Sequence, residues 1–345
     1  MSFGMYKKVI GLIYNVPVPV GHAFSEASRD ILVQVEAVEK ALNDLGHSSI
    51  RIPFTRDLSG FIRDMREARV EMAVNLCETL DDDPRFVGHP AAILELLDLP
   101  FSGSPTFALM LTTDKVMTKR LLRGNGIRTP DYVVYDGKRE FDFRLLRYPV
   151  IVKPALQDAS IGIDQGSIFK DARALDKTVM GFFEGFGTIL VEEYVEGREF
   201  NVSLFGYPSP RVLPMAEIDF SAFPRELFPI VGYRAKWDCS SFEYYYTPRK
   251  FPRGLCPALQ QRIEKTAIEC FHLLMLRDYG RVDMRVDDQG QIYVLEVNAN
   301  PCLSPDAGFA AAAQQAGMTY ADMVRQFVDF MEQRSRNNGS QASHV

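Results

Sequence analysis

Residues 280–301 combine an apolar pattern with side chains that could bind a metal ion. Alternation with a period of two predicts a β-hairpin with one apolar face on each strand. The apolar positions are Val282, Met284 and Val286 in the first strand and Tyr293, Leu295 and Val297 in the second. These side chains are expected to pack against a core, provided that residues 288–291 close the hairpin as a loop of even length.

The other face of the hairpin would place Asp283 opposite Glu296, beside Arg281 and Asn298. Two carboxylates and an amide oxygen suit a hard cation such as Mg²⁺, which in proteins normally also binds the phosphates of a substrate. A solvated hairpin face, with its charges turned to water, is the alternative that fits the same residues.

Four blocks of the sequence resemble, in order, those of the ATP-grasp enzymes, and specifically of the D-alanine–D-alanine ligase group. Residues 281–301 resemble the metal-binding signature of that group. Residues 114–119 resemble the entry to its central domain, and residues 148–154 the strand that carries a nucleotide-binding lysine. Residues 191–200 resemble the strand and turn that hold adenine and ribose. The likeness extends from about residue 100 to residue 330.

The resemblance assigns Lys115 and Lys153 to ATP, where their charges would neutralise the α and β phosphates. Lys153 is unusual on its own account, because it ends the apolar run 150–152 and precedes Pro154. A lysine with a purely structural role is hard to justify at such a place, since burying its charge is costly.

The resemblance also implies how the base and sugar are held. It places Glu192 and the backbone of Glu193 and Val195 at the adenine edge, Tyr194 at the flank of the base and Glu199 at the ribose hydroxyls. A carboxylate that accepts two hydroxyl donors is a sound ribose clamp. The competing interpretation is that Tyr194 only packs and the glutamates face water.

Two further segments are expected to close over the transferring phosphate. Residues 157–162 stand where the family has a glycine–serine–serine loop, and only Ser160 and Gly162 match that pattern. Residues 233–237 resemble the stretch that carries a phosphate-directed lysine and a lid tyrosine. Lys236 would therefore meet the phosphoryl group, and Trp237, the only tryptophan, would occupy the lid position without a phenolic hydroxyl.

The resemblance implies a reaction as well as a fold. Two Mg²⁺ ions, for which Mn²⁺ can substitute, would be bound by Asp283, Glu296 and Asn298 while a substrate carboxylate attacks the γ phosphorus of ATP. An amine would then attack the acyl phosphate, with Arg281 and a backbone amide near Cys302 holding the oxyanion. A nucleophilic role for Cys302 is disfavoured, because no histidine lies near it in the sequence.

The substrate-binding positions depart from the family pattern. Glu78 follows a predicted parallel strand, at the end where open α/β sheets bind ligands, and could hold a substrate ammonium. Ser304 and Asp306 follow the metal signature, and Asp306 would repel a carboxylate and favour an amine or hydroxyl group. D-Alanine is therefore expected to be a poor substrate in either position.

Strand and helix patterns predict an α/β chain with a three-domain ATP-grasp fold, in which an N-terminal doubly wound parallel sheet precedes two α+β subdomains. One helix is expected over residues 112–124. The expected divisions are an N-terminal domain at 1–105, a central ATP-grasp subdomain at 106–205, a C-terminal catalytic subdomain at 206–333 and a disordered tail at 334–345.

Composition limits the class of protein. The chain has 345 residues, 46% of them hydrophobic, and a net charge of -6, which argues against nucleic acid or an anionic membrane as a partner. The first residues lack the pattern of a signal peptide and no stretch approaches membrane-span length, so a soluble, cytoplasmic protein is expected. Five scattered cysteines without a C-x-x-C pair indicate free thiols.

The sequence therefore predicts an ATP-dependent carboxylate–amine ligase that acts on amino acids or small peptides through an acyl phosphate. The resemblance is compatible with a homodimer. Two other functions fit some of the same residues: a carboxylate kinase with an acceptor that is not an amine, and a nucleotide-binding regulator that does not turn over. The regulator has no need of an oxyanion arginine, which favours the enzyme.

Overall fold

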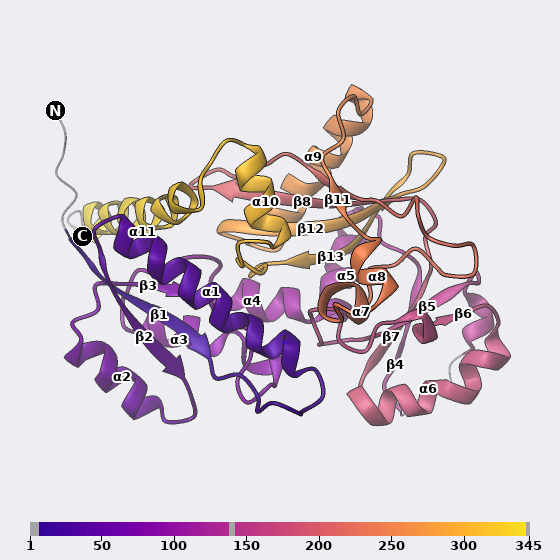
Figure 1. Ribbon diagram of the computed structural model, residues 1–345, viewed down its shortest axis with the longest axis horizontal. Helices are drawn as coiled ribbons and strands as arrows, with labels where there is room; N and C mark the ends of the chain where they lie inside the picture. Colours follow the sequence, from indigo (N-terminus) through magenta and orange to yellow (C-terminus); the bar gives the residue numbers. More distant parts are fainter. Residues whose placement is uncertain (1–6, 138–141, 343–345) are drawn as a thin grey trace.

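The computed structural model describes residues 7–137 and 142–342, which form three sheets with helices packed around them (Figure 1). The N-terminal sheet is parallel, has the order β2-β1-β3 and is covered by helices on both faces, as predicted. Its elements are β1 (Val9–Asn15), α1 (Ser25–Asp44), β2 (Ser48–Phe54), α2 (Leu58–Glu67), β3 (Met72–Asn75), η1 (Pro84–Phe86) and α3 (His89–Leu96). Buried strand residues account for this sheet: Ile10 and Leu12 face α1, whereas Ile13 faces the cluster of α2 and α3.

The single helix predicted over residues 112–124 is two helices, α4 (Thr106–Thr113) and α5 (Lys115–Gly124). Asp114 separates them because its backbone is extended and its carboxylate accepts the N–H groups of Val116 and Met117, both at 3.0 Å. This is an N-cap, which starts a new helix and ends the old one. The break places Lys115 in the first turn of α5, buried against the central sheet.

The central sheet is antiparallel, with the order β4-β7-β5-β6. Its elements are β4 (Tyr132–Tyr135), η2 (Phe143–Leu145), β5 (Val150–Pro154), η3 (Gln165–Ser167), β6 (Ile168–Phe169), α6 (Ala172–Phe186) and β7 (Ile189–Glu193). Val150, Val152 and Val191 pack against Leu175 and Val179 of α6, so one face of this sheet is closed by that helix.

The C-terminal sheet has the order β11-β10-β8-β12-β13, with β9 paired to β8. Its strands are β8 (Arg198–Gly206), β9 (Arg211–Val212), β10 (Ala216–Ile218), β11 (Arg249–Lys250), β12 (Asp278–Val286) and β13 (Ile292–Asn298). Its helices are α7 (Tyr233–Trp237), α8 (Phe242–Tyr245), α9 (Pro257–Leu273), α10 (Gly308–Gln315) and α11 (Tyr320–Ala342). The predicted division at residue 205 is therefore misplaced, because β8 pairs along its length with β12 and belongs to this sheet.

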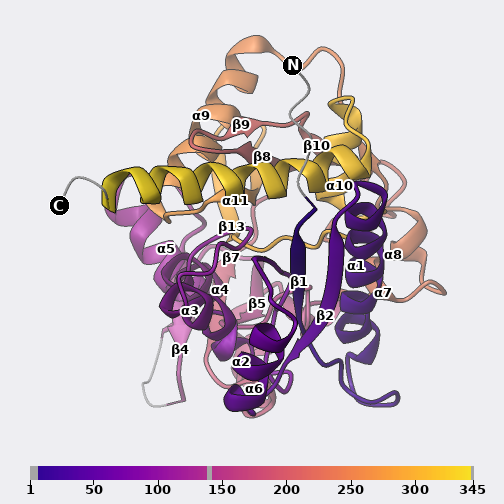
Figure 2. The ribbon, with the colours of Figure 1, turned by 90° about the vertical axis from the view of Figure 1, so that its left-hand side faces the viewer.

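Two layers of helices cover this sheet. Residues of α9 such as Ala267 and Phe271 pack on Val202 and Met284, whereas Phe205 contacts the rings of Phe309, Phe327 and Phe330 in α10 and α11. Figure 2 shows α11 running across the molecule beside the N-terminal domain, where it shares a buried cluster with α1. The C-terminal sheet and the N-terminal domain are thus joined through one core.

The β12–β13 hairpin has the predicted pairing at the end that carries Asp283 and Glu296, but not beside its loop. Asp283 lies opposite Glu296 and Arg281 opposite Asn298, as expected. Residues 287–291 form a loop of odd length, and a bulge between Asp283 and Met284 restores the register. The core side chains of β13 are consequently Ile292, Val294 and Val297, so the prediction for Tyr293 and Leu295 is wrong.

The prediction of a disordered tail from residue 334 is also wrong, because α11 continues to Ala342. Arg334 explains why the helix persists: its guanidinium bonds the fully buried carboxylate of Asp278 and the carbonyl oxygen of Phe101. A polar composition does not reveal such an anchor, since only the fold brings Asp278 to it.

None of the described helices is both long and apolar enough to span a membrane.

Candidate active site

A cavity of about 580 Å³ is bounded by residues from all three sheets and the loops between them. Every site residue predicted from the sequence lines this cavity except Lys115, whose ammonium reaches its edge from α5. The cavity thus collects side chains that are more than two hundred positions apart in the chain, from Glu78 after β3 to Asp306 before α10.

The two hairpin carboxylates, Asp283 and Glu296, stand side by side on adjacent strands. The side-chain amide of Asn298 lies 3.3 Å from an oxygen of each, and Arg281 binds both oxygens of Asp283 at 2.8 Å. Asn201 of β8, which the sequence analysis missed, also donates to Asp283 at 2.9 Å. Only the pairing of β8 with β12 makes Asn201 a neighbour of the site.

The charges around this pair set its protonation. Burial raises the pKa of Asp283 to about 6, although Arg281 acts against that shift. Burial also opposes ionisation of Glu296, but the charges of Lys115, Lys236 and Arg281 outweigh it and hold the pKa of Glu296 well below its usual range. At neutral pH both carboxylates are therefore available as anionic ligands.

The donor set fits Mg²⁺. The site has only two carboxylates, because no group of three His, Cys, Asp or Glu side chains in residues 7–137 and 142–342 is placed to hold a metal. A cation here would rest on two carboxylates, the amide of Asn298 and groups supplied by a substrate, which is how Mg²⁺ is usually bound.

A buried carboxylate fixes the lysines of the central domain. Glu192 is 1% exposed; one of its oxygens lies 2.7 Å from Nζ of Lys119 and the other accepts from Lys153. Lys119 also donates to Thr129 at 2.7 Å. Burial opposes the charge of Glu192, but the two lysines outweigh it and lower its pKa. Lys153 therefore faces the cavity from a fixed position.

Lys115 is held on the other side of the same region. Its ammonium donates to the carbonyl oxygen of Gln157 and lies 3.0 Å from the carboxylate of Asp158. Burial acts to lower the pKa of Lys115, yet the charges of Asp158 and Glu296 outweigh it and raise the pKa. The lysine is therefore charged and tied to the loop that follows β5.

That loop and the segment around α7 are joined by hydrogen bonds. Ser160 donates its hydroxyl to the carbonyl oxygen of Val231 at 2.8 Å, and the indole N–H of Trp237 donates to that of Ala159 at 3.0 Å. The indole thus supplies a lid contact without a phenolic hydroxyl. Burial lowers the pKa of Lys236, which lines the cavity among Glu296, Arg281 and Asp283.

The residues predicted for the base and ribose line one end of the cavity. The carboxylate of Glu193 is turned to Arg147, whose backbone N–H it accepts at 2.8 Å, and the backbone N–H of Glu193 donates to the carbonyl oxygen of Asp131 at 2.8 Å. Tyr194 donates its hydroxyl to Pro229 at 3.1 Å. Glu199 and the carbonyl oxygen of Val195 are both bound by Arg285, a residue absent from the predicted set.

The opposite end of the cavity holds a polar cluster that the sequence analysis found only in part. Asp30 of α1 accepts the hydroxyl of Ser304 at 2.9 Å and the thiol of Cys302 at 3.0 Å. Gln34 bridges Asp30 and Glu78, at 3.2 Å and 3.0 Å. The helical spacing of Asp30 and Gln34 on one face of α1 is the signal that could have found them.

This cluster changes the roles open to three predicted residues. Ser304 is 1% exposed and its hydroxyl is committed to Asp30, which leaves it unsuited to bind a substrate carboxylate. Burial raises the pKa of the Cys302 thiol far above its ordinary value, which removes the nucleophilic alternative. Burial raises the pKa of Glu78 to about 7, against the effect of Gln34.

Asp306 is exposed at the mouth of the cavity, beside Arg249. The guanidinium of Arg249 donates to the backbone oxygen of Asp306. Burial lowers the pKa of Arg249, and the charge of Asp306 counteracts only part of that shift. The repulsion that Asp306 would exert on a substrate carboxylate is consequently offset by a neighbouring cation.

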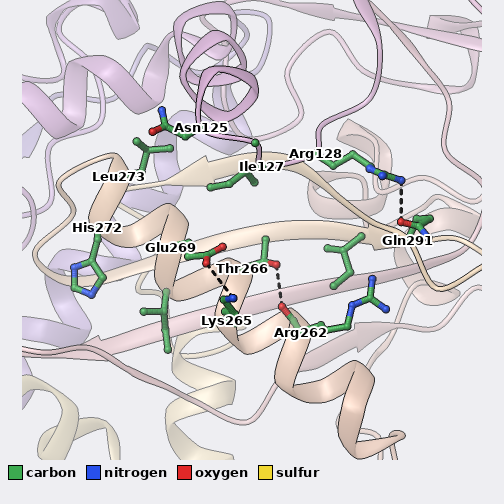
Figure 3. Close-up of a pocket in the computed structure, with 13 residues that line it drawn as sticks. Asn125, Ile127, Arg128, Arg262, Lys265, Thr266, Glu269, His272, Leu273 and Gln291 are labelled. Atoms are coloured by element: carbon green, nitrogen blue, oxygen red, sulfur yellow. Dashed lines mark hydrogen bonds and ion pairs between the residues drawn. The ribbon is translucent and has the colours of Figure 1, made fainter.

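A second hollow, of about 770 Å³, lies between α9, the end of α5 and the β12–β13 loop, and contains none of the predicted site residues. Figure 3 shows its side chains paired with one another: Arg128 donates to Gln291 at 2.9 Å and Lys265 lies 3.7 Å from Glu269. Arg128, Lys265 and Glu269 are exposed, so this hollow is a solvated surface.

Comparison with known proteins agrees with the geometry. The family model "D-ala D-ala ligase C-terminus" matches residues 121–329, more than half of the chain. The chain belongs to the D-alanine–D-alanine ligase family. A D-alanine–D-alanine ligase of Desulforudis audaxviator is 31% identical over 310 residues, which cover 86% of this chain and 92% of that protein. The y4sG protein of Sinorhizobium fredii is 31% identical over 310 residues, covering 88% and 89%.

The fold has a counterpart among solved structures of the family. The crystal structure of D-alanine–D-alanine ligase from Bacillus anthracis complexed with ATP superposes with a TM-score of 0.77, covering 96% of this chain and 99% of that one at 22% identity. The expected ATP-grasp architecture with a parallel N-terminal sheet is thus confirmed.

Glu192→Gln tests the buried carboxylate at the centre of the ligase-family site. The change would leave Lys119 and Lys153 without a counter-charge in a region shielded from water, so we expect the free energy of unfolding to fall by about 3–5 kcal/mol. Denaturant titration measures this. Glu217→Gln is the matched control, because its partner Arg198 is 45% exposed and the pair should contribute about 1 kcal/mol or less. Equal losses of unfolding free energy in the two variants would contradict the role of Glu192 as the buried counter-charge of Lys119 and Lys153.

Proposed function

We propose that the protein is an ATP-dependent ligase that joins a carboxylate to an amine through an acyl phosphate, with amino acids or small peptides as substrates. The observation that carries the proposal is the meeting of Asp283 and Glu296 with Arg281 and Lys236 in one cavity, with Lys153 on its wall. Membership of the D-alanine–D-alanine ligase family supports the same reaction class.

The charged side chains along the cavity act on different phosphates of ATP. Lys115 and Lys153 neutralise the inner phosphates of ATP, and Lys236 stands where the transferred phosphoryl group passes. Mg²⁺, held by Asp283, Glu296 and Asn298, would neutralise the outer phosphates when bound. Because Ser160 and Trp237 tie the loop 157–162 to the lid segment, closure over the phosphates excludes water from the acyl phosphate.

Arg281 acts on the second half of the reaction. It is bound by Asp283, lies 4.0 Å from Glu296, and lines the same cavity as Cys302. An oxyanion that forms when an amine attacks the acyl carbonyl would meet this guanidinium at the junction of the phosphate and polar ends. A nucleotide-binding regulator would have no use for a cation at that junction.

A mass-spectrometric assay separates the ligase from a carboxylate kinase and from a regulator. The protein, ATP, Mg²⁺ and pooled amino acids should yield equal amounts of ADP and of new amide products. Phosphate release without an amide would indicate the kinase, and binding without ADP release the regulator. Glu296→Gln is expected to lower turnover by at least about 100-fold, since it removes a metal ligand from the cavity wall. Retained turnover in that variant would sink the metal assignment.

We further propose that the carboxylate substrate carries an ammonium group, which Glu78 binds with Asp30 behind it. Gln34 donates to both carboxylates and so holds them in one cluster. The thiol of Cys302 and the hydroxyl of Ser304 offset the charge of Asp30 only in part, so negative charge remains on the side of the cavity. Since Ser304 is committed to Asp30, D-alanine is expected to be a poor acceptor.

Glu78→Gln tests this subsite. The Michaelis constant for the carboxylate substrate should rise about tenfold while that for ATP stays nearly unchanged, because binding of one partner is lost. In the wild type this constant should fall as pH rises through about 7, since Glu78 binds a cation only when ionised. The variant should lack that dependence.

Asp81→Asn is the charge-matched control for Glu78→Gln, as Asp81 pairs with Arg56 outside the cavity. Identical pH profiles for the Glu78→Gln variant and the wild type, or efficient synthesis of D-alanyl-D-alanine, would refute the assignment.

A further inference from the structure

Arg285 of β12 is a deeply buried cation at the nucleotide end of the cavity, with a side chain that is 3% exposed. Its Nε and Nη2 atoms donate to one oxygen of Glu199 at 3.1 Å and 2.9 Å. Nη1 donates to the carbonyl oxygen of Val195 at 2.7 Å, and Nη2 also donates to that of Pro229. One side chain thus joins the β7–β8 turn, strand β8 and the loop before α7.

The same guanidinium lies over the ring of Tyr194, 4.8 Å from its centre. Tyr194, which the family resemblance assigns to the flank of the base, and Glu199, which it assigns to the ribose, are therefore both in contact with Arg285. The planar guanidinium has donors at fixed angles, so two of them fix the position of one carboxylate oxygen, which the single ammonium of a lysine cannot do.

Only one oxygen of Glu199, Oε2, is used by Arg285. Among the residues that the structure describes, no side chain or backbone N–H donates to the other oxygen, and Glu199 lines the cavity. Arg285 therefore fixes the carboxylate while leaving Oε1 for a donor that enters the cavity. In an ATP complex the donors available at this end are the ribose hydroxyls.

We propose that Arg285 is a positioning residue that orients Glu199 for the ribose hydroxyls and so makes the enzyme select ribonucleotides over 2′-deoxyribonucleotides. The inference rests on the proposed use of ATP. Without the guanidinium, Glu199 is free to turn to other rotamers, and the contact that distinguishes the two sugars is lost. A residue that only cross-linked the three segments would affect both nucleotides equally.

Calorimetric dissociation constants for ATP and 2′-deoxyATP, each with Mg²⁺, test the inference without requiring turnover. The wild type should bind ATP about tenfold more tightly, as expected for one hydrogen bond to a charged group. In Arg285→Met the ratio should fall to about twofold or less, mainly through weaker binding of ATP. Arg198→Met is the control, because Arg198 of β8, the neighbour of Glu199 in the sequence, pairs with Glu217 of β10 outside the cavity; it should keep the wild-type ratio.

Glu199→Gln supplies a second measurement if Arg285→Met does not fold, and it should lose the same discrimination. An unchanged ratio in Arg285→Met, or in Glu199→Gln, would overturn the positioning role. A wild type that binds both nucleotides tightly and equally would overturn it while leaving the use of ATP intact. A wild type that binds neither would refute the proposed function itself.

Discussion

Two like charges held together in a region of low dielectric are the constraint on which this site depends. Asp283 and Glu296 face each other across β12 and β13, and both are buried enough for desolvation to oppose their ionisation. Such a pair ionises only where cations converge on it. Arg281 comes from the same hairpin, but Lys115 and Lys236 come from α5 and from the lid segment. The metal-binding face is therefore complete only when the central domain and the lid stand over the C-terminal sheet.

The same principle organises the rest of the cavity. Three charged groups that could meet ATP are fixed by a group of opposite sign: Lys153 by Glu192, Lys115 by Asp158 and Glu199 by Arg285. Pre-positioned charges cost little reorganisation when a ligand binds. At the polar end the arrangement differs, because Asp30 and Glu78 have hydrogen-bond donors around them but form no ion pair with another of the described residues. A cation from a substrate would complete that balance.

The sequence alone was sufficient to predict features that depend on residues close together in the chain. The period of β12 and the place of Lys153 at the end of an apolar strand follow from neighbouring residues, and the structure has both. Asp283 also lies opposite Glu296 as predicted, although a bulge and not an even loop produces that pairing. Contacts that depend on strand order or domain packing were not accessible. Asn201 reaches Asp283 only through the β8–β12 pairing, and Asp30 meets Ser304 only through the contact between α1 and the loop after β13. The odd loop turned Ile292 and Val294 of β13 to the core in place of Tyr293 and Leu295, and the length of a loop cannot be recognised from alternation alone.

Transfer of oxygen from the carboxylate substrate to phosphate tests the account most directly. Amino acids labelled with ¹⁸O in their carboxylates would be incubated with the protein, ATP and Mg²⁺, and the released phosphate and amide analysed by mass spectrometry. If the carboxylate attacks the γ phosphorus and the amine then displaces phosphate from carbon, each amide formed must release one phosphate that carries one ¹⁸O atom. Amide formation accompanied by unlabelled phosphate, or ADP formation with unlabelled phosphate alone, would contradict the acyl-phosphate mechanism that the arrangement of Arg281, Lys236 and the two carboxylates implies.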